Sequence, residues 1–188
     1  MLNSPIACAR CTESNHPSTR FCSKCGLPLG SMQPDAGVGS DALGTYEAPE
    51  PADPDTSRSI RDLVSRCGLA STPSGHGWRV IVPRPLDRRQ AVYIGFVGTD
   101  HEQRPILSLI SICGPATDRD ARFLLKLNAR IVEGHFAIKT LRGEEYFVVI
   151  QNIASDQAAK VDAANLVRRI AEAADDFEDR LSRGRDLY

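Results

Sequence analysis

The C-terminal two-thirds of the chain carries a regular apolar and polar pattern that predicts helices and strands in turn. A first amphipathic helix is predicted over 58–67, with Thr56 or Ser57 as its cap and Gly68 at its end. Its core face comprises Ile60, Leu63, Val64 and Cys67. Three β-branched and aromatic runs bounded by turn residues then predict strands, over 78–82, 91–97 and 106–113. Because these strands follow one another without a helix between them, we expect an antiparallel meander.

A second helix, two strands and a long helix are predicted after the meander. The helix over 118–130 follows a Gly-Pro-Ala-Thr start signal. One side of it is predicted to be apolar through Phe123, Leu124, Leu127 and Ile131. Strands over 136–141 and 145–151 flank an Arg-Gly-Glu turn, with Phe136, Ile138, Phe147 and Val149 on one face. From Asp156 an apolar stripe predicts one helix of about 25 residues that ends near Gly184. The order α-β-β-β-α-β-β-α predicts an α+β domain over residues 57–188.

Length and composition exclude several classes of protein. The chain has 188 residues, of which 41% are hydrophobic and 25% charged, so wholesale disorder is excluded and a TIM barrel is too large. The sequence lacks an apolar stretch of the ~18 residues that a membrane span needs, and its first residues do not resemble a signal peptide. We therefore expect a cytoplasmic protein without a membrane association.

The chain has a net charge of -1, but its charges are unevenly distributed among three segments. Residues 1–29 carry three basic side chains and one acidic, whereas residues 30–56 carry six acidic and no basic side chains. Residues 30–56 also contain four glycines and four prolines and few apolar residues. Such a segment cannot bury enough surface to offset its chain entropy, so we expect a flexible acidic linker between residues 1–29 and 57–188. Docking of Val38, Leu43 and Tyr46 on a neighbouring part is the alternative.

Four cysteines predict a metal centre at the N-terminus. Cys8, Cys11, Cys22 and Cys25 have the spacing Cys-x2-Cys-x10-Cys-x2-Cys, within a segment that has almost no apolar core. Four thiolates complete the tetrahedral shell that a structural Zn²⁺ ion prefers, and a closed shell leaves no open position for catalysis. A disulfide pair, a redox pair and an iron–sulfur cluster are the alternatives. The shell is full without His16, which we expect in an exposed loop.

The second cysteine pair carries a resemblance to a known family. Phe21 directly before Cys22, Gly26 directly after Cys25 and a leucine shortly beyond resemble the short bacterial zinc-ribbon family, over about residues 6–29. The resemblance implies a small domain that is held together by one zinc ion.

Residues 57–188 resemble a second group by the order of their elements. Ile-Leu-Ser-Leu-Ile-Ser, a helix with Leu-Leu-Lys-Leu-Asn, and Phe-Ala-Ile-Lys are similar to the type III secretion chaperone-like superfamily and the bacterial sensory transduction regulator family. That resemblance implies a small homodimeric domain that binds polypeptide on a sheet or in a helix groove. It does not imply a role in secretion.

The residues that could support catalysis are few and scattered. His76, His101 and His135 lie in predicted turns or at a strand start, and Cys113 ends an apolar strand. The sequence contains no Walker loop, dinucleotide-binding glycine pattern or His-Glu-x-x-His motif. We therefore expect a protein that is not an enzyme.

Protein binding and nucleic-acid binding remain as alternatives. A phosphate-binding face needs concentrated positive charge, but residues 1–29 provide only Arg10, Arg20 and Lys24. Two further basic groups lie in the C-terminal part: Arg84, Arg88 and Arg89, and the arginines of the last helix, which alternate with acids. We expect a zinc-binding adaptor or chaperone-like protein with a protein partner and a homodimeric C-terminal domain. The alternative is a nucleic-acid-associated regulator that uses the zinc ribbon.

Overall fold

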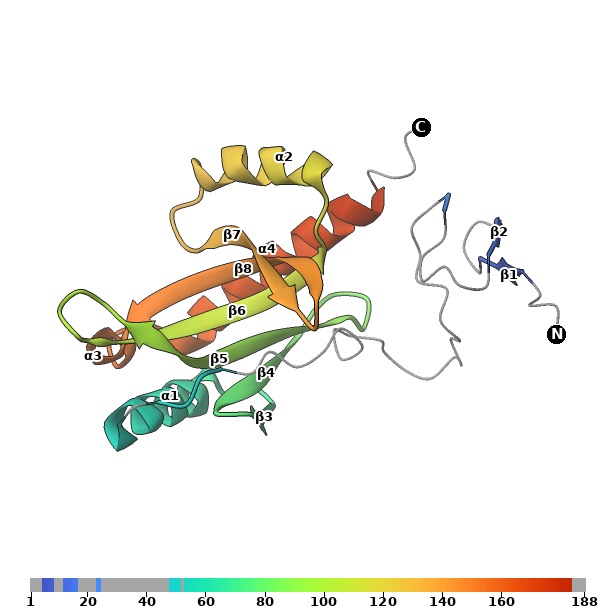
Figure 1. The fold of residues 1–188 in the computed structure, drawn as a ribbon. Helices are drawn as coiled ribbons and strands as arrows, with labels where there is room; N and C mark the ends of the chain where they lie inside the picture. Colours follow the sequence, from blue (N-terminus) through green and yellow to red (C-terminus); the bar gives the residue numbers. More distant parts are fainter. Residues whose placement is uncertain (1–4, 9–11, 17–22, 25–47, 52, 184–188) are drawn as a thin grey trace. The chain divides into compact units, whose positions relative to one another are not determined.

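The computed structural model describes residues 5–8, 12–16, 23–24, 48–51 and 53–183 (Figure 1). The chain divides into two compact units, which are described separately here. One unit spans Gly37–Asp176, and the other combines Met1–Ala36 with Phe177–Tyr188.

The larger unit is an α+β fold around a six-stranded antiparallel sheet, which confirms the predicted fold class. Its elements, of which the last extends past Asp176, are α1 Pro54–Cys67, β3 Ser71–Ser74, β4 Gly77–Pro83, β5 Arg89–Thr99, β6 Pro105–Pro115, α2 Asp118–Asn128, β7 His135–Leu141, β8 Glu144–Ala154, α3 Ser155–Ala158 and α4 Ala163–Arg183. The strand order is β3-β4-β5-β6-β8-β7, so the predicted meander is present as β4-β5-β6. Strands β3 and β7 form the two edges of the sheet.

The β7–β8 hairpin follows the prediction closely. Arg142 and Gly143 form its two-residue turn with φ of 53° and 83°, and positive φ at both positions suits the right-handed twist of paired strands. Phe136 lies opposite Val149 and Ile138 lies opposite Phe147, so these four apolar residues share one face as expected.

Helix α4 covers one face of the sheet and runs behind β6 and β8 in Figure 1. A Cβ atom placed on Gly134 would lie 3.3 Å from Cδ1 of Ile170 and 3.6 Å from Cγ1 of Val149, so α4 packs on the face to which Val149 belongs. Helix α1 joins the same layer, since the Cys67 thiol lies 3.7 Å from the carbonyl oxygen of Ala163. The first core lies between these helices and the sheet.

The second face of the sheet carries its own apolar cluster. Its buried members are Ala48, Ala91, Tyr93, Ile110, Ile112, Tyr146, Val148 and Ile150. Ala48 forms a parallel bridge with Gly75. Ala48 lies within residues 30–56, the range predicted as a linker, so the end of that range contributes to the fold. Residues Val38, Leu43 and Tyr46 of the same range lie outside the described residues.

The first helix begins earlier than the sequence pattern predicts. Asp53, rather than Thr56 or Ser57, is the N-cap, and its side chain accepts a hydrogen bond of 2.7 Å from the backbone N–H of Thr56. Pro54 occupies the first turn, where its missing N–H leaves no hydrogen bond unmade. The predicted start at residue 58 was wrong because apolar periodicity begins only at Ile60, nearly two turns inside the helix. Gly68 ends the helix in the left-handed conformation as predicted, with φ 61°.

The long final helix predicted from Asp156 is instead two helices. The short α3 ends at Ala158, and Asp162 starts α4 by accepting a hydrogen bond of 3.0 Å from the backbone N–H of Asn165. The guanidinium of Arg66 in α1 donates to the carbonyl oxygens of Ala158 and Val161 between the two helices. A hydrogen bond between two residues that are 92 positions apart in the sequence therefore stabilises the break between α3 and α4.

Two further details differ from the sequence pattern. Strand β3 was not predicted, because Ser-Thr-Pro-Ser has no apolar alternation, and it forms by pairing with β4. Helix α2 ends at Asn128, two residues before the predicted end. Among the residues of α2 whose burial is described, Leu124 alone is buried and Phe123 is 44% exposed, so the predicted apolar side is not a full core face.

The smaller unit contains a short antiparallel hairpin near the N-terminus. Strands β1 Ile6–Ala7 and β2 Ser14–Asn15 pair with Ile6 opposite Asn15. Across the described residues of both units, no helix combines the length and apolar character that a membrane crossing requires.

Candidate metal centre and interaction surface

Cys8 lies at the end of the first strand of the N-terminal hairpin. The backbone N–H of Thr12 donates to the carbonyl oxygen of Cys8, and the N–H of Cys8 donates to the carbonyl oxygen of Glu13, both over 2.9 Å. These bonds hold Cys8 against Thr12 and Glu13. The Cys8 residue is 2% exposed and is not in a disulfide. A buried thiol suits metal ligation better than redox exchange, which needs an accessible sulfur.

Asn15 links this hairpin to the segment that holds the second cysteine pair. Its side-chain oxygen accepts hydrogen bonds from the backbone N–H of Ser23 at 2.8 Å and from the Ser23 hydroxyl at 3.0 Å. Asn15 is 3% exposed, and its amide nitrogen donates to the carbonyl oxygen of Glu13 at 2.8 Å. Ser23, which follows Cys22 in the sequence, is therefore held beside the N-terminal hairpin.

The other three predicted zinc ligands lie outside the described residues. These are Cys11, Cys22 and Cys25. Within the described ranges there is no group of three or more His, Cys, Asp or Glu side chains that could hold a metal ion. Four-thiolate zinc ligation therefore remains a prediction, and it fits the chemistry of the donor set and the burial of Cys8.

The histidines and the remaining cysteines have the environments expected from the sequence. His76, His101 and His135 are exposed, the first two in turns and the third at the first residue of β7. His16 is also exposed.

Cys67 and Cys113 are 2% and 1% exposed, and neither is in a disulfide. Burial raises the pKa of the Cys67 thiol, so this group stays protonated and unreactive near neutral pH.

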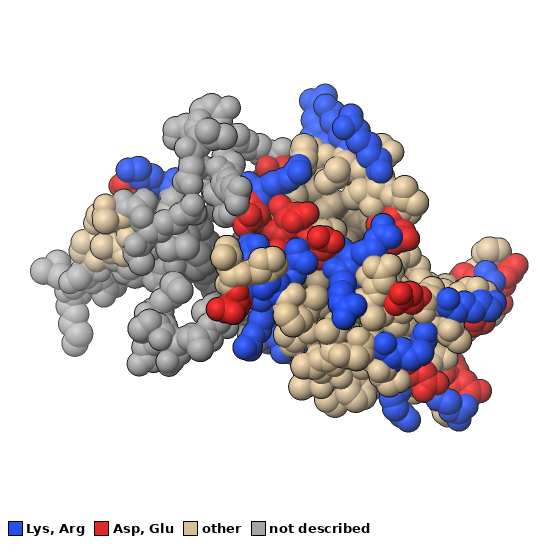
Figure 2. All heavy atoms as spheres, turned by 180° about the vertical axis from the view of Figure 1, so that it is seen from behind, with Lys and Arg blue, Asp and Glu red and all other residues tan. Residues whose placement is uncertain are grey.

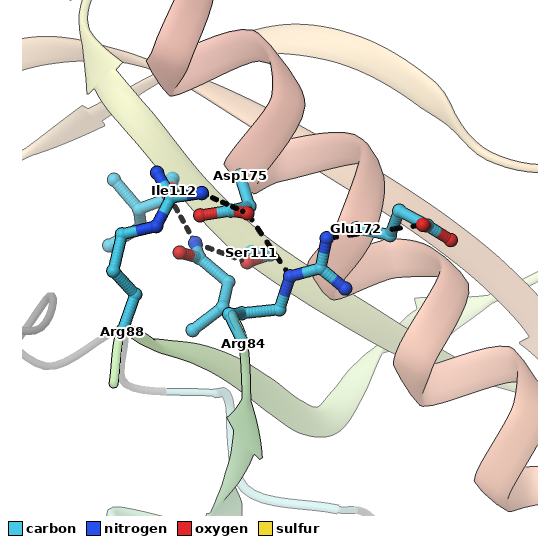
Figure 3. Close-up of polar contacts among 7 residues, drawn as sticks. Arg84, Arg88, Ser111, Ile112, Glu172 and Asp175 are labelled. Atoms are coloured by element: carbon cyan, nitrogen blue, oxygen red, sulfur yellow. Dashed lines mark hydrogen bonds and ion pairs between the residues drawn. The ribbon is translucent and has the colours of Figure 1, made fainter. Parts of the chain in front are cut away.

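A buried ionic cluster joins the β4–β5 connection to α4 (Figure 3). Asp175 is 4% exposed, and its Oδ2 accepts from Nε of Arg84 at 3.1 Å and from Nη2 of Arg88 at 3.0 Å. Nη2 of Arg84 also lies 3.9 Å from Oε1 of Glu172. Arg84 and Arg88, which form a basic group in the sequence, both neutralise an acidic residue of α4. Their acidic partner is 91 and 87 residues away, too far for a local sequence signal.

Gln90 adds a polar contact next to this cluster. Its amide nitrogen donates to the Ser111 hydroxyl at 2.9 Å and to the carbonyl oxygen of Ile112 at 2.8 Å, and the Ser111 hydroxyl donates to the carbonyl oxygen of Ala91. Gln90 and Ser111 are buried, so these bonds satisfy polar atoms that the core would otherwise leave unpaired. The two clusters connect the β4–β5 connection, β5, β6 and α4 through buried polar contacts.

The outer surface of α4 carries charges of both signs. Figure 2 shows basic and acidic side chains next to one another on the face seen from behind, where α4 lies. Exposed α4 residues include Arg168, Arg169, Glu172 and Asp176. Mixed charge of this kind is typical of a solvated helix and lacks the concentrated positive potential of a phosphate-binding face.

The edge of the sheet at β7 is partly protected and partly open. The amide group of Asn128 in α2 donates to the carbonyl oxygen of Phe136 at 2.9 Å and accepts from its backbone N–H at 2.8 Å. Phe136 therefore directs both backbone groups away from β8. Since outward and inward residues alternate along an antiparallel strand, Ile138 and Thr140 direct theirs outward as well. The Asn128 side chain thus satisfies the outward backbone groups of Phe136, the first outward residue of this edge. The sequence pattern did not predict this role.

Exposed apolar side chains lie on the elements beside this edge. Ile138 is 47% exposed and Phe123 is 44% exposed, whereas Leu125 and Val132 are 71% and 96% exposed. An edge strand accompanied by exposed apolar residues is a typical surface for pairing with another polypeptide. We refer to the outward backbone groups of Ile138 and Thr140, together with the exposed Ile138 side chain, as the β7 edge surface.

Comparisons with known proteins give distant likenesses to solved structures alone. No family model and no curated protein matches the chain. Among solved structures, the crystal structure of YbjN from E. coli, described as "a putative transcription regulator", is similar over 68% of this chain and 92% of that chain. The sequence identity is 10% and the TM-score is 0.44. A likeness this distant shows no family, so the function is inferred below from the residues of this chain.

Proposed function

We propose that this protein is a non-enzymatic adaptor with a zinc-binding N-terminal segment and an α+β domain that binds a protein partner. The observation that carries the proposal is the β7 edge surface, where outward backbone groups and the exposed side chain of Ile138 lie on one strand. A partner strand would pair with Ile138 and Thr140 and cover the Ile138 side chain.

A second copy of this chain is one such partner. Two β7 edges can pair antiparallel about a twofold axis, which is the symmetry of most homodimers. We therefore propose that the domain forms a homodimer through the β7 edge surface, and that a different protein partner competes for the same edge.

Light scattering tests the dimer with a matched pair of variants. The wild-type chain and Leu86→Arg are expected to give a dimeric mass at micromolar concentration, whereas Ile138→Arg gives a monomeric mass. Leu86 is 90% exposed in the β4–β5 connection, so it controls for the removal of an exposed apolar side chain. A monomeric wild-type chain, or an equal loss of dimer in both variants, contradicts the proposal.

Four thiolates, those of Cys8, Cys11, Cys22 and Cys25, are proposed to bind one structural Zn²⁺ ion. The hydrogen bonds of Cys8 and those between Asn15 and Ser23 support this ligand set. The ion supplies the stability that a segment with so few apolar residues cannot obtain by burial.

Thiol titration tests the zinc centre in the intact chain. The chain has six cysteines, of which Cys67 and Cys113 are buried in the α+β fold. We expect one zinc per chain by elemental analysis, with four thiols that become reactive after chelation and two that react only after denaturation. A Cys113→Ala control should retain its zinc. Iron in place of zinc, or thiols that react equally before and after chelation, contradicts the assignment.

Purification from the native host distinguishes a protein partner from nucleic acid. We expect a stoichiometric protein that remains bound after nuclease treatment and whose association changes little with salt, as is typical of apolar contact. Recovery that is lost with nuclease, or affinity that falls steeply with salt, would instead indicate phosphate binding and the alternative function.

A further inference from the structure

The second face of the sheet is buried although helices α1 and α4 lie on the opposite face. Val148, Ile110 and Tyr93 of the second face are 0%, 1% and 2% exposed. In the apolar cluster of this face, Ala48 is the one described member that does not belong to a strand. The two helices therefore do not account for the burial of this face, and Ala48 indicates which segment of the chain to consider.

Ala48 shows where the chain reaches this face. A Cβ atom placed on Gly95 would collide with the Cβ of Ala48, so Ala48 packs directly against the backbone of β5. Glycine at this position is required because any larger residue would displace Ala48. Consecutive Cα atoms are about 3.8 Å apart, so the residues directly before Ala48 must also begin on or beside the second face.

Charge on the second face complements the segment that precedes Ala48. Arg79 lies opposite Tyr93 and Lys139 lies opposite Tyr146, so both basic residues share the face with the apolar cluster, and both are half-buried. Residues 30–56 contain six acidic and no basic side chains. Burial lowers the pKa of Lys139, as expected for an amine that is shielded from water.

We propose that residues 38–47 of this chain cover the second face, with Val38, Leu43 and Tyr46 over the apolar cluster and Asp41 and Glu47 toward Lys139 and Arg79. The segment is long enough: β5 and β7 are three strand spacings apart, about 15 Å, which about five extended residues span. This intramolecular docking surface does not depend on zinc or on a protein partner. With residues 38–47 docked, fewer residues remain as a linker between residues 1–29 and the α+β domain.

Photo-crosslinking in the full-length chain tests the occupant directly. With Tyr46→p-benzoylphenylalanine, we expect crosslinks within one chain to peptides of β5, β6 or β8. The same probe at Asp55, whose side chain is 83% exposed at the start of α1, serves as the control and should not crosslink to these peptides. Mixing isotopically labelled and unlabelled protein separates crosslinks within one chain from those between chains. Crosslinks between chains would assign the face to a second copy, and absence of crosslinks to these strands would overturn the proposal.

Lysine acetylation provides a second measurement without a bulky probe. Lys160 is exposed, so Lys139 should be acetylated about tenfold more slowly than Lys160 in the wild-type chain. In the triple variant V38S/L43S/Y46S this difference should largely disappear, while circular dichroism keeps its wild-type helical signal. Equal acetylation of the two lysines in the wild-type chain, or unchanged protection of Lys139 in a folded triple variant, contradicts the proposal.

Discussion

At the scale of single residues, buried polar groups of the α+β fold determine how its connections are held. The Asp175 carboxylate accepts from two arginines, one of which, Arg84, has a side chain that is only 16% exposed. The ion pair thus fixes the turn between β4 and β5 against α4 more firmly than apolar contact alone, because its hydrogen bonds are directional.

Asp175→Asn is expected to lower the free energy of unfolding by about 1–3 kcal/mol, since the amide accepts weaker hydrogen bonds and leaves the guanidinium of Arg84 less neutralised. Part of this loss is offset because Arg88 is 41% exposed and can be solvated. Urea denaturation measures the effect. The control is Asp176→Asn, an exposed neighbour on the same helix, which should stay within about 0.5 kcal/mol of wild type. Equal effects at both positions would show that the buried pair contributes nothing specific.

A close backbone approach makes Gly95 sensitive to a single methyl group. Gly95→Ala should destabilise the fold by about 1–3 kcal/mol through overpacking against Ala48. Adding Ala48→Gly should recover most of that loss, so a double-mutant cycle by urea denaturation should give a coupling of about 1 kcal/mol or more. Additive effects of the two substitutions would mean that the residues do not contact in solution.

At the scale of elements, the start of α1 depends on one carboxylate. Asp53 accepts from both the backbone N–H and the hydroxyl of Thr56, each at 2.7 Å. These hydrogen bonds favour the ionised form and hold the pKa of Asp53 below its ordinary value. The cap therefore couples the stability of the first helix to acid pH.

Because the pKa of Asp53 is lower in the folded than in the unfolded chain, its stabilising contribution is complete above the unfolded value of about 3.9. It is lost as pH falls through the folded value. Asp53→Asn should therefore flatten the decline in the denaturation midpoint below about pH 4, as urea titrations between about pH 3 and pH 6 would measure. Asp62→Asn, at an exposed position on the same helix, should keep the wild-type decline. An unchanged acid slope in Asp53→Asn would contradict this assignment of the cap.

At the scale of the whole molecule, all helices of the described ranges lie between Pro54 and Arg183. The predicted zinc ligands all lie before residue 26. We therefore propose that the N-terminal segment and the α+β domain fold independently, with different sources of stability: metal ligation in one and apolar burial in the other.

Cys22→Ser is expected to abolish zinc binding, since metal ligation supplies on the order of 10 kcal/mol of folding free energy in four-ligand zinc domains. The helical circular dichroism signal and its thermal transition should remain at wild-type values. Loss of the helical signal together with the zinc would contradict independent folding. Cys67→Ala, at a buried position of α1, should have the opposite effect: a lower thermal midpoint with zinc retained.

The sequence by itself determined those elements whose residues interact with near neighbours. The Arg142-Gly143 turn, the Gly68 helix end and the apolar alternation of the β7–β8 hairpin are local, because backbone conformation and side-chain period depend on residues a few positions apart. The α+β class followed from the order of these elements. The cysteine spacing is local in the same sense, so it predicts zinc without reference to the α+β fold.

Only the tertiary structure decided features that join residues far apart in the chain. Strand β3 exists because β4 pairs with it, and the break between α3 and α4 is held by Arg66 from α1. Asp175 contacts its two arginines, and Ala48 contacts Gly95, only because distant segments pack together in the fold. The hydrophobic pattern or a motif of one segment does not predict such contacts. Their free energy is gained only when the two distant segments have been brought together by folding.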